Sequence, residues 1–210
     1  MLPGSPPEVF VLAFIIGLTG ALAPGPVLVA TIDASLTHGW TAGPRIGFGH
    51  ILIESLIFLL ILGGIGAGAA SYAGIIGAAG GVALIAFGTM TVRGAVRDDV
   101  KVVSGAMHDP VLVGIITSAA NPYFWIWWGS IGSAFLIAGI TGGLAMAALF
   151  MAGHWTADVG WLMVVSVGVH RGRTILSDRW YRYVLLACGV FLVAFGGYFL
   201  IDAAGFFKAG

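Results

Sequence analysis

The 210-residue sequence has very little charge. Only 9% of its residues are Asp, Glu, Lys or Arg, whereas 59% are hydrophobic and the mean hydropathy is +1.04. A soluble domain carries about 25% charged residues, and a chain this apolar could not cover a water-facing surface. Nine basic and nine acidic residues cancel, so the net charge indicates no particular partner. The composition predicts an integral membrane protein whose main surroundings are the lipid bilayer.

Cysteine and nucleotide-binding motifs are also scarce. The single cysteine, Cys188, excludes an intrachain disulfide. The sequence contains no Walker-type loop, Rossmann fingerprint or Cys-x-x-Cys pair, so we expect no cofactor, and ATP-driven transport would need another subunit. The few basic residues lie beside apolar segments, which predicts no nucleic-acid partner. We find no nucleophile–base arrangement of the kind that a membrane-embedded enzyme would need, and we expect that the protein is not an enzyme.

Long apolar runs dominate what is present. A membrane-spanning helix needs about 20 apolar residues, and six segments qualify, at 8–36, 43–66, 71–93, 110–138, 142–169 and 182–203. The first resembles a signal peptide, but no Lys or Arg precedes it, so we expect it to be retained. The one polar connection in the middle of the chain is a linker at 94–109. It divides the sequence into two three-helix halves, 1–93 and 110–210.

The basic residues predict the orientation of these spans. Eight of the nine Lys and Arg residues fall in the first, third and fifth connections: Arg45, Arg93, Arg97, Lys101, Arg171, Arg173, Arg179 and Arg182. Cytoplasmic loops carry an excess of Lys and Arg. We therefore expect these connections in the cytoplasm, both termini outside, and a multi-pass membrane protein.

Two short motifs indicate that the halves are related. GHILIE at 49–54 and GHWTAD at 153–158 share the pattern Gly-His-x-x-x-acid, and each lies in the second helix of its half. The chain has only five histidines, and two of them occupy these matched positions. Because each half has an odd number of spans, the halves must run in opposite directions through the bilayer. The sequence thus predicts an all-α membrane protein of six transmembrane helices, arranged as two inverted three-helix repeats.

Proline interrupts the first helix of each half. Pro24, Gly25 and Pro26 lie near the middle of one helix, and Asn121 and Pro122 near the middle of the other. Proline lacks an N–H group and clashes with the carbonyl four residues earlier. We expect free carbonyls at Gly20, Leu22 and Ser118, satisfied by a polar cavity, a substrate ammonium or an ion. A simple kink, satisfied by Thr19, Thr117 or a neighbouring helix, is the alternative.

The paired motifs place ionisable groups inside the membrane. His50 and Glu54 share a helix face, as do His154 and Asp158. Such groups are functional candidates by default, although two local pairs that only lock helices together would give the same pattern. Histidine titrates near neutrality, which suits coupling of export to proton entry. Two imidazoles and two carboxylates would also suit a divalent transition-metal ion.

Several short motifs resemble the lysine exporter (LysE/RhtB) family. They are Ala-Pro-Gly-Pro at 23–26, GWTAGPRIGFGH at 39–50 with Gly39, Gly43 and Gly47, and Asn121-Pro122. The resemblance implies a small six-helix inner-membrane protein that exports amino acids with the proton gradient. The family often has Lys after Asn-Pro, where Tyr123 stands here, and the Gly-His-x-x-x-acid pair is not typical of its amino-acid exporters. The wider superfamily also resembles exporters of cadmium, nickel and manganese.

These observations predict a secondary transporter for an amino acid or similar small zwitterion, coupled to protons. The predicted substrate and coupling site comprises Pro24, Gly25, Pro26, His50, Glu54, Asn121, Pro122, His154 and Asp158. The alternative is a divalent metal exporter, with the ion as substrate at His50, Glu54, His154 and Asp158. An aromatic run at 123–128 fits either a membrane interface or the cavity. Gly64/Gly68 and Gly77/Gly81 predict close helix packing, within the chain or between the copies of a homodimer.

Overall fold

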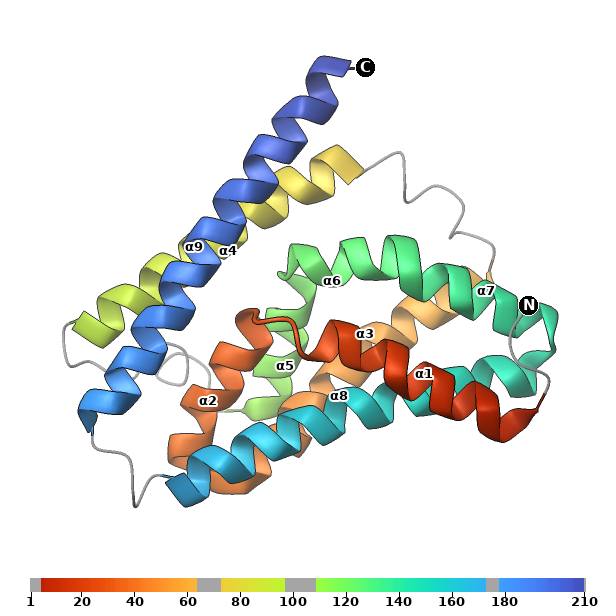
Figure 1. Ribbon diagram of the computed structural model, residues 1–210, viewed down its shortest axis with the longest axis horizontal. Helices are drawn as coiled ribbons and strands as arrows, with labels where there is room; N and C mark the ends of the chain where they lie inside the picture. The colour runs from red at the N-terminus through yellow and green to blue at the C-terminus, as the bar shows by residue number, and fades with distance from the viewer. Residues whose placement is uncertain (1–4, 64–72, 97–108, 173–177, 210) are drawn as a thin grey trace.

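The computed structural model describes residues 5–63, 73–96, 109–172 and 178–209, and these ranges are almost entirely helical (Figure 1). The elements in chain order are α1 (Pro6–Ala21), α2 (Pro26–His38), a 3₁₀ turn (Gly39–Thr41), α3 (Ala42–Leu62), α4 (Ala73–Val96), α5 (Pro110–Ala119), α6 (Pro122–Trp127), a π-helical turn (Trp128–Gly132), α7 (Ser133–Thr141), α8 (Leu144–Gly172) and α9 (Asp178–Ala209).

Four segments of the described chain are helical, apolar and long enough to cross a membrane. They are Pro26–Leu62, Pro122–Thr141, Leu144–Gly172 and Leu186–Gly205. The shorter apolar helices are Pro6–Ala21, Leu84–Val96 and Pro110–Ala119. The first of the four segments contains a 3₁₀ turn between α2 and α3. The structure therefore shows a helical protein with several membrane-spanning segments, and the arrangement of six spans in two inverted halves stays a prediction.

Both predicted helix interruptions are present. The chain leaves helical conformation between α1 and α2 and again between α5 and α6. Pro26 and Pro122 are the first residues of the helices that follow, where the missing N–H has no intrahelical partner to lose. Pro110 starts α5 in the same way, and Asp109 caps it by accepting a bond from the N–H of Val111 at 3.0 Å. Pro6 begins α1 as well, so proline begins four described helices and interrupts two longer ones.

The prediction of free carbonyls at these interruptions was wrong at two of its three positions. The carbonyl of Gly20 accepts a hydrogen bond from the N–H of Ala23, and that of Ser118 accepts one from the N–H of Asn121, both at 3.1 Å. In each helix the last turn tightens to an i→i+3 bond, which gives the carbonyl a new donor without any ligand.

Only some of the predicted connections between helices lie within the described residues. The predicted turn at 139–143 is confirmed, because α7 ends at Thr141 and α8 begins at Leu144, with Gly143 at a φ of 105°. The predicted turn between α3 and α4, with Gly64 and Gly68, falls mostly outside the described residues, as does most of the linker 94–109. The division of the chain at that linker stays a prediction.

Helices α4 and α9 pack along each other and form a pair beside the other helices (Figure 1). Glycine allows the close contact. A Cβ atom on Gly81 would lie 2.8 Å from the carbonyl oxygen of Gly196, and one on Gly88 would lie 2.6 Å from that of Gly189. Gly81 therefore packs within the chain, as small-residue pairs between membrane helices commonly do. A homodimer stays a prediction.

The remaining helices pack across the two halves of the chain. Helix α1 lies along α8, α5 lies along α3, and α3 contacts α8. The contact between α3 and α8 depends on Gly43 and Gly47. A Cβ on Gly43 would lie 2.3 Å from the carbonyl oxygen of Leu162, and one on Gly47 would lie 3.0 Å from Val159. These glycines bring the second helix of each half into direct contact.

Four helix ends that carry arginine lie on one side of the molecule. They are the start of α3 with Arg45, the end of α4 with Arg93, the end of α8 with Arg171 and the start of α9 with Arg182, toward the left of Figure 1. Arg182 donates hydrogen bonds to the carbonyls of Ala95 and Val96 at the end of α4. Which side faces the cytoplasm stays a prediction from the excess of Lys and Arg.

Candidate functional site

A cavity lies where the two interrupted helices meet α3 and α8. Residues from the end of α1, the start of α2, α3, α6, the π-helical turn and α8 line it, and its empty volume, including space at its mouth, is about 560 Å³. The cavity lies between the helices that carry the residues of the predicted site.

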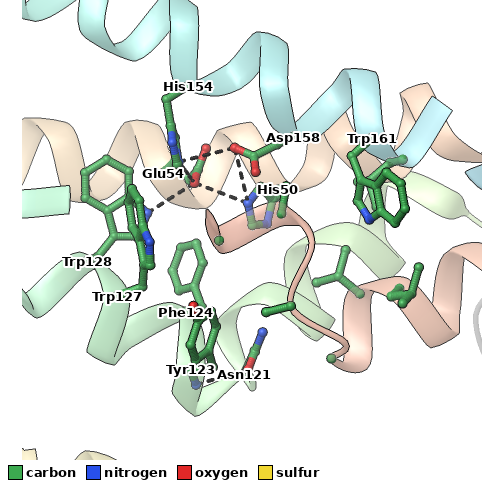
Figure 2. Close-up of a pocket in the computed structure, with 17 residues that line it drawn as sticks. His50, Glu54, Asn121, Tyr123, Phe124, Trp127, Trp128, His154, Asp158 and Trp161 are labelled. Atoms are coloured by element: carbon green, nitrogen blue, oxygen red, sulfur yellow. Dashed lines mark hydrogen bonds and ion pairs between the residues drawn. The ribbon is translucent and has the colours of Figure 1, made fainter. Parts of the chain in front are cut away.

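The centre of the cavity wall is a cluster of two histidines and two carboxylates (Figure 2). Glu54 and His154 are 1% and 2% exposed, and Asp158 is 4% exposed. The Nε2 atom of His154 lies 2.9 Å from Oε1 of Glu54 and 3.2 Å from Oδ2 of Asp158. The Nε2 atom of His50 lies 3.2 Å from the same Glu54 oxygen and 4.0 Å from the same Asp158 oxygen.

The cluster joins α3 to α8 in a reciprocal way. Each helix carries a histidine and an acid four residues apart, which places both side chains on one face. Each histidine contacts the acid of its own helix and also the acid of the other helix. The sequence predicted the first kind of contact from spacing. The second kind exists because the α3 glycines let the two helices touch.

Ser118 of α5 forms a hydrogen bond with Nδ1, the second ring nitrogen of His50. Its hydroxyl lies 2.6 Å from Nδ1 of His50 and donates to the carbonyl of Gly114, also at 2.6 Å. When this hydroxyl donates to Gly114, its oxygen can only accept from Nδ1. His154 has no equivalent contact. Its Nδ1 is buried without a hydrogen-bond partner in the described part of the chain, and it faces Gly17 of α1. The two histidines therefore differ in environment although their motifs match.

Two tryptophans close one side of the cluster. The indole Nε1 of Trp128 donates to Oε1 of Glu54 at 3.1 Å, and the ring of Trp127 stacks on His154 with centroids 4.7 Å apart. Both rings are buried, although they are neighbours in sequence. The π-helical turn Trp128–Gly132 follows directly, and a Cβ on Gly132 would lie within 3 Å of both rings. Gly132 thus leaves the space that the two rings occupy.

Two carboxylate oxygens remain without a hydrogen-bond partner. Oε1 of Glu54 accepts hydrogen bonds from Trp128 and His154, whereas Oε2 of Glu54 and Oδ2 of Asp158 are buried and accept no hydrogen bond from any described residue. Oδ2 of Asp158 does have an ion-pair contact with Nε2 of His154 at 3.2 Å. A buried polar atom normally has a partner, from the protein or from a bound molecule. Both side chains line the cavity, so a cation or a hydrogen-bond donor in the cavity would supply the missing partner.

The two helix interruptions are in contact with each other beside this cluster. The hydroxyl of Tyr123, at the start of α6, donates to the carbonyl of Thr19 near the end of α1 at 3.2 Å. Nε1 of Trp127 donates to the Thr19 hydroxyl, also at 3.2 Å. Asn121 caps α6 through the N–H of Tyr123, and its side chain lies beside Gly25. Aromatic side chains from one interruption thus satisfy polar groups at the other.

The structure places the predicted site residues in two groups. His50, Glu54, His154 and Asp158 meet at the cluster, and Gly25 and Asn121 line the same cavity. Pro26 and Pro122 are buried helix starts, Pro24 is exposed, and none of the three prolines lines the cavity. The prolines therefore shape the site through the backbone that they interrupt.

Comparison with known proteins agrees with this architecture. A family model described as LysE type translocator matches residues 18–203. The chain belongs to this family. Translocators of the family export small molecules across membranes, so this LysE type translocator is a multi-pass membrane transporter. The comparison with curated proteins and the comparison with solved structures give no match.

Sequence reasoning missed several residues of this LysE type translocator site. Ser118 was considered only for its carbonyl, and the aromatic run was left between the membrane interface and the cavity. In the structure Tyr123, Phe124, Trp127 and Trp128 all line the cavity. A signal was available, because aromatic residues directly after a helix-breaking Asn-Pro lie near the break. The sequence does not indicate the π-helical turn that directs two successive rings inward.

Trp128→Phe should destabilise the protein, because it removes the buried indole N–H group that donates a hydrogen bond to Glu54. A hydrogen bond to a charged group contributes about 1.5–3 kcal/mol. Trp155→Phe is the matched control, because the Trp155 Nε1 is buried without a partner among the described residues. Thermal unfolding of both purified variants in detergent measures the difference. Equal unfolding temperatures for the two variants would contradict the assignment of this bond.

Proposed function

We propose that this LysE type translocator exports an amino acid or similar small zwitterion from the cell, coupled to proton entry. The observation that supports this most is the position of the His50, Glu54, His154 and Asp158 cluster, which lines the same cavity as the two helix interruptions. Ionisable groups inside a membrane protein mark substrate and proton pathways, and interrupted helices form the binding sites of many transporters.

We further propose that the two halves form an inverted repeat. The packing supports this, because the helix that opens each half lies along the second helix of the other half: α1 along α8, and α5 along α3. The glycines of the two matched motifs occupy these contacts. A Cβ on Gly153 would lie 2.4 Å from the carbonyl oxygen of Phe10, and one on Gly49 would lie 2.1 Å from that of Val111. The motif glycine therefore has the same packing role in each half.

The two carboxylates are proposed to have different roles. Glu54 lies between both histidines and Trp128, all of which contact its Oε1 atom. It is well placed to exchange a proton with the imidazoles. Asp158 contacts His154 closely and His50 only at 4.0 Å, which leaves it more available to a substrate ammonium group. Proton entry would be coupled to substrate export because the proton and the substrate ammonium group compete for the same cluster of histidines and carboxylates.

The test is transport by the purified protein in lipid vesicles. Vesicles loaded with each of the twenty standard amino acids, isotopically labelled, should lose at least one of them faster when the outside is made acidic. Protein-free vesicles under the same gradient provide the baseline. Efflux of every amino acid at the protein-free rate would rule out the proposal.

A divalent transition-metal ion is the second candidate substrate. His50, Glu54 and Asp158 each offer one ligand atom, and these three atoms lie within 4.8 Å of one another. Imidazole and carboxylate together suit zinc, manganese or nickel. The arrangement is compatible with binding such an ion as cargo in the cavity.

Metal analysis of the purified protein tests this candidate. If a metal ion is the cargo, protein purified after growth with added zinc, manganese or nickel should contain about one ion per chain. His50→Ala and His154→Ala should lower this content, because they remove imidazole ligands. A metal content that is at background in the native protein, or that is unchanged in both variants, would exclude a divalent metal ion as the transported substrate.

A further inference from the structure

The first turn of α2 lies at the cavity and contains backbone donors that have no acceptor within the helix. Gly25 is the N-cap residue and has no side chain that could cap the helix, and Pro26 follows at the first helical position. The N–H groups of Val27 and Leu28 have no partner within the helix, because they belong to its first turn. Gly25, Val27 and Leu28 line the cavity. The start of a helix also carries a partial positive charge, which favours an anion there.

The other three described helices that begin at proline differ from α2 in this respect. Ser5 stands at the capping position of α1, the side chain of Asp109 caps α5, and that of Asn121 caps α6. Among these four helices, α2 alone has a glycine at the capping position. The backbone at Gly25 is extended, with φ −151° and ψ −178°, so this conformation does not require glycine. The missing side chain leaves the donors of the first turn open to the cavity.

Asn121 adds a further donor at the same place. Its Oδ1 atom accepts the N–H of Tyr123 at 3.1 Å, which directs the Nδ2 amino group the other way. This amino group lies against α2, because a Cβ on Gly25 would be 3.3 Å from Nδ2. The capping bond therefore orients an N–H₂ group toward the uncapped helix start.

Trp161 of α8 supplies a donor without an acceptor. Its Nε1 atom is buried and has no hydrogen-bond partner in the described ranges, and its side chain lines the same cavity as Val27 and Leu28. Buried indole N–H groups usually have a partner. In Figure 2 the chain that joins α1 to α2 passes between the labelled side chains of Asn121 and Trp161. Residues with three kinds of donor, namely backbone N–H, amide N–H₂ and indole N–H, thus line one cavity.

The acidic cluster lines another part of the same cavity. The buried Oε2 atom of Glu54 accepts no hydrogen bond, and Oδ2 of Asp158 has only ion-pair contacts with the two histidines, so both can receive a further cation or donor. The donors around α2 need an acceptor. From this we infer that the start of α2, Asn121 and Trp161 form a subsite for the carboxylate of the exported substrate, while the acids receive its ammonium group. The inference rests on the proposed function and assigns the two ends of the zwitterion to different walls.

Gly25→Ser and Gly25→Ala together test the uncapped helix start. Both variants place the same Cβ beside Asn121, so the difference between them isolates the serine hydroxyl. A serine at the N-cap bonds to the N–H groups of the first turn and would compete with a substrate carboxylate. Serine should raise the half-saturating amino-acid concentration about fivefold relative to alanine, the fold-change that corresponds to a typical N-cap. Equal half-saturating concentrations would overturn the subsite.

A second test uses the native protein and changes the ligand instead, by replacing the carboxylate of the amino acid with a carboxamide. For each amino acid that leaves the vesicles, its carboxamide is offered as a competitor, because it keeps the ammonium group and lacks the carboxylate. The carboxamide should compete at least about tenfold less well than the amino acid, because it loses a charge-assisted bond. Equal competition would overturn the subsite while leaving amino-acid export intact.

A separate measurement covers the case in which no amino acid is exported. Acetate and acetamide are then compared by their effect on the unfolding temperature of the full-length protein in detergent, since a bound ligand stabilises the folded state. In the Gly25→Ala variant, acetate should raise the unfolding temperature more than acetamide does. In the Gly25→Ser variant, this difference between the two compounds should be smaller. That result keeps the subsite although export has failed. No difference between acetate and acetamide would overturn the subsite as well.

Discussion

Glu54→Gln should reduce proton-driven export at least about tenfold. Removing one charge from a buried ion pair costs about 3–5 kcal/mol, and each ~1.4 kcal/mol corresponds to a factor of ten. Glu54 is 1% exposed, and its Oε1 atom contacts His50, His154 and Trp128. Glutamine keeps the size of the side chain and one acceptor oxygen but cannot carry a proton between the two imidazoles. Initial efflux from vesicles under an acid-outside gradient measures the effect.

The control is the same substitution at an exposed acid. Glu8 lies in the first turn of α1, where its carboxylate accepts the N–H of Ser5 at 3.2 Å, and glutamine can keep that bond. Glu8→Gln should export at the native rate. Exchange of labelled for unlabelled substrate without a gradient separates two roles of Glu54. Retained exchange with lost gradient response indicates proton coupling, and a Glu54→Gln flux equal to the native flux under the gradient would refute it.

Gly153→Ala should destabilise the protein strongly. The new Cβ would lie 2.4 Å from the carbonyl oxygen of Phe10 and 3.0 Å from the Ala13 side chain, so α1 would have to move away from α8. Overpacking of a core costs about 1–3 kcal/mol, occasionally more, and here the contact is backbone, which cannot rotate away. The neighbouring His154 would move with the helix, so export should fall as well. Thermal unfolding and vesicle transport measure the two effects.

Gly160→Ala on the same helix is the matched control. A Cβ there would have no described atom within 4 Å, and alanine is favoured over glycine inside a helix by about 0.5–1 kcal/mol. Gly160→Ala should therefore be neutral or slightly stabilising. If the two alanine variants unfolded at the same temperature, the close approach of α1 to α8 would be wrong. The equivalent change Gly49→Ala should resemble Gly153→Ala, because Gly49 has the same role against α5.

Much of the helical framework followed from apolar length and proline. The predicted segments at 43–66 and 142–169 correspond to α3 and α8, and Pro24–Pro26 and Asn121-Pro122 mark the real interruptions. The prediction failed in detail at the interrupted ends, where tightened turns satisfy carbonyls that proline was expected to leave free. Local sequence predicts that a helix must stop at such a position. It does not show how the last turn rearranges, because that depends on backbone geometry.

The acidic half of the candidate site could also be anticipated. The i,i+4 spacing placed His50 beside Glu54 and His154 beside Asp158, and the predicted substrate and coupling site included both pairs. Of the donor half, Gly25 and Asn121 were predicted as site residues, but the donors of Trp161 and of the first turn of α2 were not. Trp161 and α2 line one cavity because α2 packs against α8, which is distant in sequence.

The sequence alone determined that this chain is an apolar, multi-helix membrane protein with two interrupted helices and two matched His–acid pairs. It did so because length, hydrophobicity, proline and helical spacing act over a few residues. The tertiary structure decided which groups meet: Glu54 with His154, Trp128 with Glu54, and Asn121 with Gly25. These contacts join residues separated by 74 to 100 positions, and they form only where glycines let helix backbones approach within van der Waals distance.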